Sequence, residues 1–156
     1  MRGDPDNKKG IHDKCGRFID QIFFMKRMIA QLSLLVRDYD EAIDFYVGKL
    51  GFVLIEDTRL SESKRWVVVA PSADAGGCRL LLAQASDEEQ RGRVGNQTGG
   101  RVFLFLHTDD IARDHRRLVA EGVRVVREPA VQPYGTVLVF ADLYGNLWDM
   151  IEPVVG

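Results

Sequence analysis

The stretch "DLYGNLWDMIEP", residues 142–153, places one carboxylate, Asp149, in the middle of an alternating apolar run. Turn residues followed by such alternation are typical of a strand that leaves a tight turn. A carboxylate is costly to bury there, and it usually has a hydrogen-bonding partner or a chemical task. Asp149 is therefore our candidate catalytic residue, as a base or as an acceptor for a ligand. In the alternative interpretation it only accepts hydrogen bonds from Arg79, Arg101, Tyr134 or a backbone N–H.

A second polar position occurs in "MIAQLSLLV", which the sequence predicts to be a strand. Gln31 and Ser33 share one side of its alternation, and Leu32 and Leu34 share the other. Because the leucines are expected to pack on a helix, Gln31 and Ser33 should face the opposite side. We expect both to line a ligand pocket.

Aromatic residues provide candidate walls for that pocket. Trp66 and Tyr134 are the preferred ligand-contacting positions, whereas Trp148, adjacent to Asp149, should point to the opposite face and join the core. His107 ends a strand on the side expected to face a helix, so we interpret it as structural. Neither Cys15 nor Cys78 has a base at an informative spacing, so a nucleophilic thiol has no support.

Composition limits the partners of the chain. Its 156 residues, 46% of them hydrophobic, fit one globular domain, and a net charge of −2 provides no basic face for nucleic acid. The apolar run "FIDQIFFMKRMIAQL" is interrupted by charges, which argues against a membrane span or signal segment. Two cysteines in unrelated contexts do not predict a disulfide framework, so we expect a cytoplasmic protein.

The chain divides into an extension, two similar modules and a linker. Residues 1–28 are predicted to be flexible or to form a short helix, with Phe18, Ile22 and Phe23 as its apolar side. Module one (29–85) and module two (101–153) each read as strand, helix and three strands, and residues 86–100 join them as a linker or lid. Asp38 is expected to cap the first helix and Gly51 to end it.

The two modules also agree in register. Asp38, Gly51 and the strand that follows map onto Asp109, Gly122 and its following strand with one constant offset of 71 positions. Agreement of cap, helix length and element order favours an internal duplication.

The stretches "SLLVRDYDEAIDFYVGKLGFVLIED" and "YGTVLVFADLYGNLWDMIEP" resemble the opening and closing motifs of the vicinal oxygen chelate superfamily, the glyoxalase, bleomycin resistance protein and extradiol dioxygenase group. The resemblance covers about residues 29–153. It implies an α+β fold of two βαβββ modules whose curved mixed sheets form a cup with helices outside, often completed in a homodimer.

The resemblance also implies where a metal would bind. In metal-dependent members, one inward position on the first and last strand of each module carries His, Gln or Glu. Those positions fall here on Gln31, Leu81, Val102 and Asp149. Only Gln31 and Asp149 are residual ligand-like positions, and a catalytic divalent ion normally takes three or four protein ligands. We therefore expect no tightly held metal, and Val102 becomes a pocket-lining position.

The sequence thus predicts a cytoplasmic, homodimeric protein that binds a small molecule in the cup, with no nucleic-acid or membrane partner. Two alternatives stay open. One is a metal-dependent lyase or dioxygenase acting on vicinal oxygens through an atypical site. The other is a non-catalytic binding or immunity module.

Overall fold

The computed structural model describes residues 28–73 and 77–154. The predicted extension, with its short helix and Cys15, lies outside the described residues, apart from Met28. Within the described ranges, the order of elements is strand, helix and three strands, twice, with one further helix between the two sets. This order confirms the predicted α+β class of two βαβββ modules.

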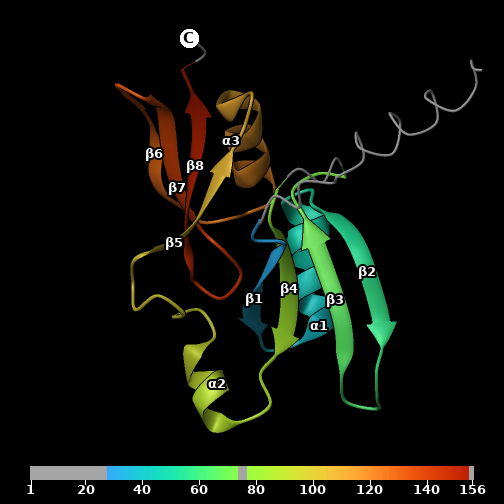
Figure 1. Cartoon of the computed structure of the whole chain (residues 1–156). Coiled ribbons are helices and arrows are strands. Elements are labelled where there is room, and N and C mark those ends of the chain that lie inside the picture. Colours follow the sequence, from blue (N-terminus) through green and yellow to red (C-terminus); the bar gives the residue numbers. More distant parts are fainter. Residues whose placement is uncertain (1–27, 74–76, 155–156) are drawn as a thin grey trace, which may run out of the picture.

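The first sheet contains β1 (Gln31–Val36), β2 (Val53–Arg59), β3 (Arg65–Ala70) and β4 (Arg79–Gln84) in the order β1-β4-β3-β2. β1 runs parallel to β4, and the other pairs are antiparallel (Figure 1). Their β-branched and leucine-rich sequences suit a pleated, largely covered surface.

The second sheet repeats this arrangement. It contains β5 (Val102–His107), β6 (Val125–Gln132), β7 (Gly135–Ala141) and β8 (Leu147–Pro153) in the order β5-β8-β7-β6, with β5 parallel to β8. β5 follows β1 at the constant offset of 71 positions that the sequence predicted. No strand of one sheet is hydrogen-bonded to a strand of the other in the described part of the chain.

The first module's helix begins as α1 (Tyr39–Ile43) and continues as a π-helical segment, η1 (Asp44–Lys49). The Asp38 side chain accepts hydrogen bonds from the backbone N–H groups of Asp40 and Glu41, so the predicted cap is confirmed. Gly51 follows at φ +78°, as a helix-ending glycine should. The predicted helix is therefore present between this cap and this glycine, and its second half, η1, has the wider π turn.

The second module's helix is α3 (Ile111–Ala120). Its cap is Asp110, whose side chain accepts from the backbone N–H of Arg113. The offset of 71 positions had pointed to Asp109, so that prediction is wrong by one residue. Asp109 instead forms an ion pair with Arg113 at 2.8 Å.

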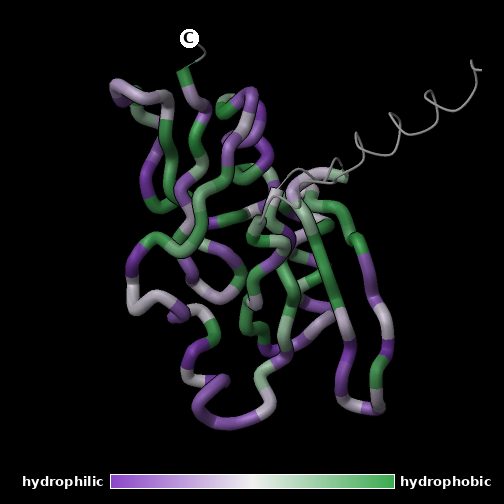
Figure 2. Tube along the Cα trace, viewed as in Figure 1, coloured by the Kyte–Doolittle hydropathy of each residue, from purple (hydrophilic) through white to green (hydrophobic). Residues whose placement is uncertain are grey.

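One hydrophobic core lies between the modules. It joins the inner faces of both sheets, which are the faces packed on α1, η1 and α3, and it includes Leu34 and Leu82 from the first sheet and Phe140 and Trp148 from the second. The buried Trp148 confirms the core position predicted for it. The outer face of each sheet, opposite to its inner face, points away from this shared core. Figure 2 shows apolar residues along the strands and polar residues along the linker between the modules.

The linker is more ordered than the sequence suggested. It contains α2 (Glu88–Arg93), capped by the side chain of Asp87, which accepts from the backbone N–H of Gln90 at 2.8 Å. Within residues 28–73 and 77–154, no helix has the length and apolar character needed to cross a membrane.

Candidate functional site

Asp149 lies on the outer face of the second sheet. In the strand register it is flanked by Phe105 of β5 and Val139 of β7. Phe105 is 65% exposed, whereas Val139 is buried. The Oδ1 atom of Asp149 is itself buried and has no hydrogen-bond partner among the described residues. A buried carboxylate oxygen without a donor is an unfavourable arrangement that a ligand or a partner molecule would relieve.

The partners that the sequence suggested for Asp149 do not reach that oxygen. No hydrogen bond joins Asp149 to Arg79, Arg101 or Tyr134 within the described part of the chain. The interpretation of Asp149 as a structurally satisfied acid is therefore not supported for Oδ1.

His107 lies on the outer face too. The register of β5 against β8 shifts between Val102 and Leu104, and beyond the shift His107 is opposite Ile151, on the same side as Asp149. The predicted helix-facing orientation of His107 is wrong, because the irregularity reverses the alternation of the strand. His107 is exposed and forms no hydrogen bond or ion pair with the described residues.

Gln31 and Ser33 lie on the outer face of the first sheet. The register places Gln31 beside Arg79 and Ser33 beside Leu81 on the adjacent strand β4. Their neighbours Leu34 and Val36 are fully buried on the inner face, as the alternation predicted. Trp66 lies farther across this outer face, opposite Thr58 of β2.

The predicted site residues thus fall into two groups on two sheets. Gln31, Ser33 and Trp66 belong to the first sheet, whereas Val102, opposite Leu147, shares the second sheet with Asp149. Tyr134 lies in the turn between β6 and β7 and is 60% exposed.

The donor set does not fit a metal ion. Leu81 and Val102 occupy two of the four positions that metal-dependent members would use, and aliphatic side chains cannot coordinate a cation. The described residues contain no cluster of three or more His, Cys, Asp and Glu side chains suited to a metal.

The sequence interpretation missed Asp142, the first residue of "DLYGN". Asp142 is only 6% exposed. Its Oδ1 accepts from the backbone N–H groups of Tyr144, Gly145 and Asn146. Its Oδ2 accepts from the Tyr46 hydroxyl at 2.7 Å, the Asn146 amide at 2.9 Å and the Trp148 indole at 3.3 Å. Asp142 therefore fixes the turn that begins β8 and bonds it to the helix of module one.

Tyr46 is the partner of Asp142 in the first module. Its side chain is fully buried, and burial together with the Asp142 carboxylate raises the pKa of Tyr46 well above its usual value. The hydroxyl therefore remains a protonated donor at neutral pH. The signal in the sequence was an acid three residues before the Gly-Asn pair, a spacing typical of a side chain that closes its own turn.

The linker adds a second connection between the modules. Gln97 accepts from the Leu35 backbone N–H at 2.7 Å and donates to the Ser33 carbonyl at 3.1 Å, at the edge of β1 that faces away from β4. Its own backbone N–H donates to the Asn146 side chain. The start of β8 is thereby connected to the strand that carries Gln31.

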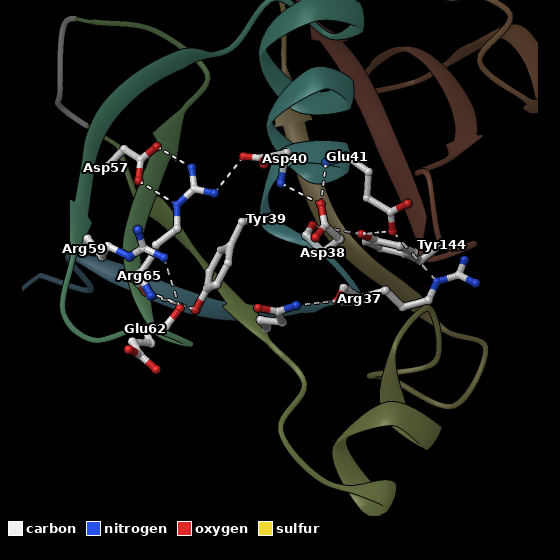
Figure 3. A network of polar contacts seen from close by, with 11 residues as sticks. Arg37, Asp38, Tyr39, Asp40, Glu41, Asp57, Arg59, Glu62, Arg65 and Tyr144 are labelled. Carbon is white, nitrogen blue, oxygen red and sulfur yellow. Dashed lines mark hydrogen bonds and ion pairs between the residues drawn. The ribbon is translucent and has the colours of Figure 1, made fainter.

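Charged contacts strengthen the outside of module one (Figure 3). Arg65 binds Asp57 and Asp40, at 2.5 and 2.6 Å, and its guanidinium lies over the Tyr39 ring. The hydrogen bond from Arg65 holds the pKa of Asp57 below its usual range. This network joins α1 to β2 and β3 and touches none of the predicted site residues.

A cavity of about 330 Å³ lies between the modules on the side of the inner faces. Its walls include Leu32, Leu80, Leu104 and Trp148, and Cys78 and His107 also border it. None of the predicted ligand-contacting residues lines it, although Phe105 and His107, whose side chains lie on the outer face of the second sheet, border the cavity at β5.

Comparison with known proteins agrees with this architecture. Residues 28–150 match the family model of the Glyoxalase/Bleomycin resistance protein/Dioxygenase superfamily. The chain belongs to this superfamily. The predicted family resemblance is thereby confirmed, and the two successive sets of strand, helix and three strands agree with the fold of this superfamily.

Individual relatives of this superfamily member include an uncharacterized protein of Shewanella frigidimarina (strain NCIMB 400), 59% identical over 129 residues, which cover 82% of this chain and 95% of that protein. Among solved structures, the antibiotic-binding protein TnmS3 of Streptomyces sp. CB03234 is 31% identical, with a TM-score of 0.68, covering 83% of this chain and 98% of its own. A superfamily member from Sphaerobacter thermophilus DSM 20745 is 28% identical, with a TM-score of 0.69, covering 82% and 98%.

Proposed function

We propose that this protein binds a small molecule in a cup made by two copies of the chain, without a tightly held metal. The outer face of the first sheet of one copy, with Gln31, Ser33 and Trp66, would form one half. The outer face of the second sheet of the other copy, with Val102, Tyr134 and Asp149, would form the other half.

The observation that carries the proposal is the state of Asp149 in the single chain. Its Oδ1 is buried without a donor, beside a phenylalanine that is 65% exposed. A sheet face with an unsatisfied acceptor and an exposed aromatic side chain is typical of a surface that a ligand or a second protein molecule covers. Because both sheets use their inner faces for one shared core, the outer faces are the surfaces left for a cup.

Similarity to known proteins supports the same reading. TnmS3 is an antibiotic-binding protein, and nearly the whole length of TnmS3 is similar to this chain. We therefore propose an aromatic molecule with polar groups as the ligand, with Asp149 as the acceptor for one of its donors. The cytoplasmic location expected from the sequence is kept as part of this proposal.

The test combines mass, metal content and ligand binding. We expect sedimentation velocity to show a dimer, elemental analysis to show no stoichiometric divalent metal, and a panel of aromatic antibiotics to contain compounds that raise the melting temperature. Asp149→Asn should reduce that thermal shift, whereas Glu89→Gln, which removes an exposed charge on α2, should leave it unchanged.

Each alternative has its own outcome in this experiment. Stoichiometric Ni, Zn, Fe or Mn that is lost in Asp149→Asn would favour the metal-dependent lyase or dioxygenase. A metal-free dimer that no compound stabilises would favour the non-catalytic module. A monomeric wild-type chain would contradict the two-copy cup.

A further inference from the structure

Asp149 has no positively charged partner among residues 28–73 and 77–154. Its register neighbours across the second sheet are Phe105 and Val139, which have no donor to offer. Beyond Val139 lies Arg127 of β6, which is exposed and makes no ion pair with Asp149. None of these described residues supplies a donor to the buried Oδ1, and a donor from a second copy of the chain would satisfy it.

Arg79 lies on the outer face of the first sheet. It lies beside Gln31 in the register of β1 and β4 and is half-buried, yet its guanidinium makes no hydrogen bond or ion pair within residues 28–73 and 77–154. Among the described residues, Arg65 is the other half-buried arginine, and it binds Asp57 and Asp40. Half-buried guanidinium groups are normally paired in this way.

These two side chains are complementary in charge and lie on the two faces that the proposed cup brings together. We propose that Arg79 of each chain forms an ion pair with Asp149 of a second copy, across the floor of the cup. This inference rests on the proposed function, because only a cup shared by two copies places the first and second outer faces opposite each other.

The ion pair would occupy the place of a metal ion. Gln31 and Asp149 are the two ligand-like positions that remain, and Arg79 lies next to Gln31. A guanidinium bound there would neutralise the carboxylate and supply the positive charge that a divalent ion supplies elsewhere, while repelling a cation. It would account for aliphatic residues at positions 81 and 102, since a cup with its own fixed cation needs no further metal ligands.

The pair also narrows the ligand class. A guanidinium has five N–H donors, and a bidentate contact with a carboxylate uses two of them. The remaining donors would point toward a carbonyl, phenolate or carboxylate oxygen of the ligand. The expected occupant is thus an aromatic molecule that carries such an acceptor.

A charge-exchange experiment tests the pair. Arg79→Glu and Asp149→Arg are made singly and together, and the dimer dissociation constant is measured by sedimentation equilibrium. Each single change should weaken the dimer by at least about tenfold, because it places like charges opposite each other. The double variant should regain most of this loss. Circular dichroism checks folding, and the milder pair Arg79→Gln and Asp149→Asn repeats the cycle if a reversal variant does not fold.

Arg127→Glu is the matched control, since Arg127 is the arginine nearest to Asp149 across its own sheet. It should leave the dissociation constant unchanged. Two results would overturn the inference while leaving the dimeric cup intact: single variants that dimerise normally, or a double variant as weak as the singles. Rescue of Asp149→Arg by Arg127→Glu would also overturn it, in favour of a contact within one chain. A monomeric wild-type protein would instead defeat the cup itself.

Discussion

The contact between Tyr46 and Asp142 gives a prediction whose size follows from the structure. The Tyr46 hydroxyl donates to Asp142 Oδ2 at 2.7 Å, and the two side chains are 0% and 6% exposed respectively. Tyr46→Phe removes this one donor and keeps the ring that packs against Phe52 and Trp148. Water cannot replace the lost donor without opening the core.

A hydrogen bond to a charged group contributes about 1.5–3 kcal/mol. In Tyr46→Phe, Oδ2 still accepts from Asn146 and Trp148, so the carboxylate is not left without donors. We therefore expect the free energy of unfolding to fall by about 1.5–2 kcal/mol, the lower part of that range. Urea unfolding at fixed protein concentration measures it, with an unchanged dependence on denaturant.

Tyr144→Phe is the matched control. The Tyr144 hydroxyl donates at the same distance, 2.7 Å, but to Glu41, whose side chain is 46% exposed. Water can solvate that carboxylate when the hydroxyl is removed, so the expected loss is below about 1 kcal/mol. Equal losses in the two variants would refute the reasoning that burial of Asp142 makes its contact the stronger one. A loss below about 0.5 kcal/mol in Tyr46→Phe would refute the proposed connection between the modules.

Three further predictions concern the linker between the modules and the ion pair between Arg65 and Asp57. Gly95→Ala would place a Cβ 1.9 Å from the Tyr144 carbonyl oxygen, whereas Gly99→Ala meets no atom within 4 Å, and both glycines have positive φ. Urea unfolding should show a loss of about 1–2 kcal/mol for Gly99→Ala from backbone strain alone, and a further 1–3 kcal/mol or so for Gly95→Ala; equal losses would contradict the close approach. For Asp57, the lowered pKa means that its pair with Arg65 stabilises the fold above the unfolded-state pKa and is lost as pH falls through the folded-state pKa. The stability difference between wild type and Asp57→Asn should therefore shrink below about pH 4, and a difference that persists in acid would argue against the ion pair. Finally, Gln97→Ala should speed hydrogen exchange of the Leu35 amide but not of Leu34, whose amide points toward β4; equal acceleration of both amides would indicate general loosening of β1.

The sequence predicted the fold from its periodicity and its turn residues. The alternation of Leu32, Leu34 and Val36 identified the inner face of β1, and Gly51 and Gly122 marked the helix ends at which the structure has positive φ. These signals are local, so a single sequence carries them. The internal offset between the modules then fixed the order of the elements.

The exact register was harder to predict. Alternation alone placed His107 on the inner face, and the shift in β5 after Val102 moved it to the outer one. The cap of α3 differed by one residue for a similar reason, because Asp109 and Asp110 are equally good capping residues and only the final packing selects between them. One-residue irregularities have no periodic signature.

Asp142 and Asp149 show how far residue type can guide the search for a site. Both acids lie in "DLYGNLWDMIEP", yet Asp142 accepts six hydrogen bonds and Asp149 Oδ1 accepts none. The difference arises from partners distant in sequence, such as Tyr46, which cannot be identified from the motif.

The position of Asp149 also depends on Asp142. By closing the turn and holding it against module one, Asp142 sets where β8 begins, and thus which side of the sheet Asp149 faces. The hydrogen bonds of Asp142 make the start of β8 rigid, and this rigidity holds Asp149 in place. A buried carboxylate oxygen without a donor persists only where the surrounding structure fixes it. If Asp142 were loosened, Asp149 could turn to solvent and would no longer need a partner. The acid at the turn is therefore structural, and the acid on the strand is the one that we propose for binding.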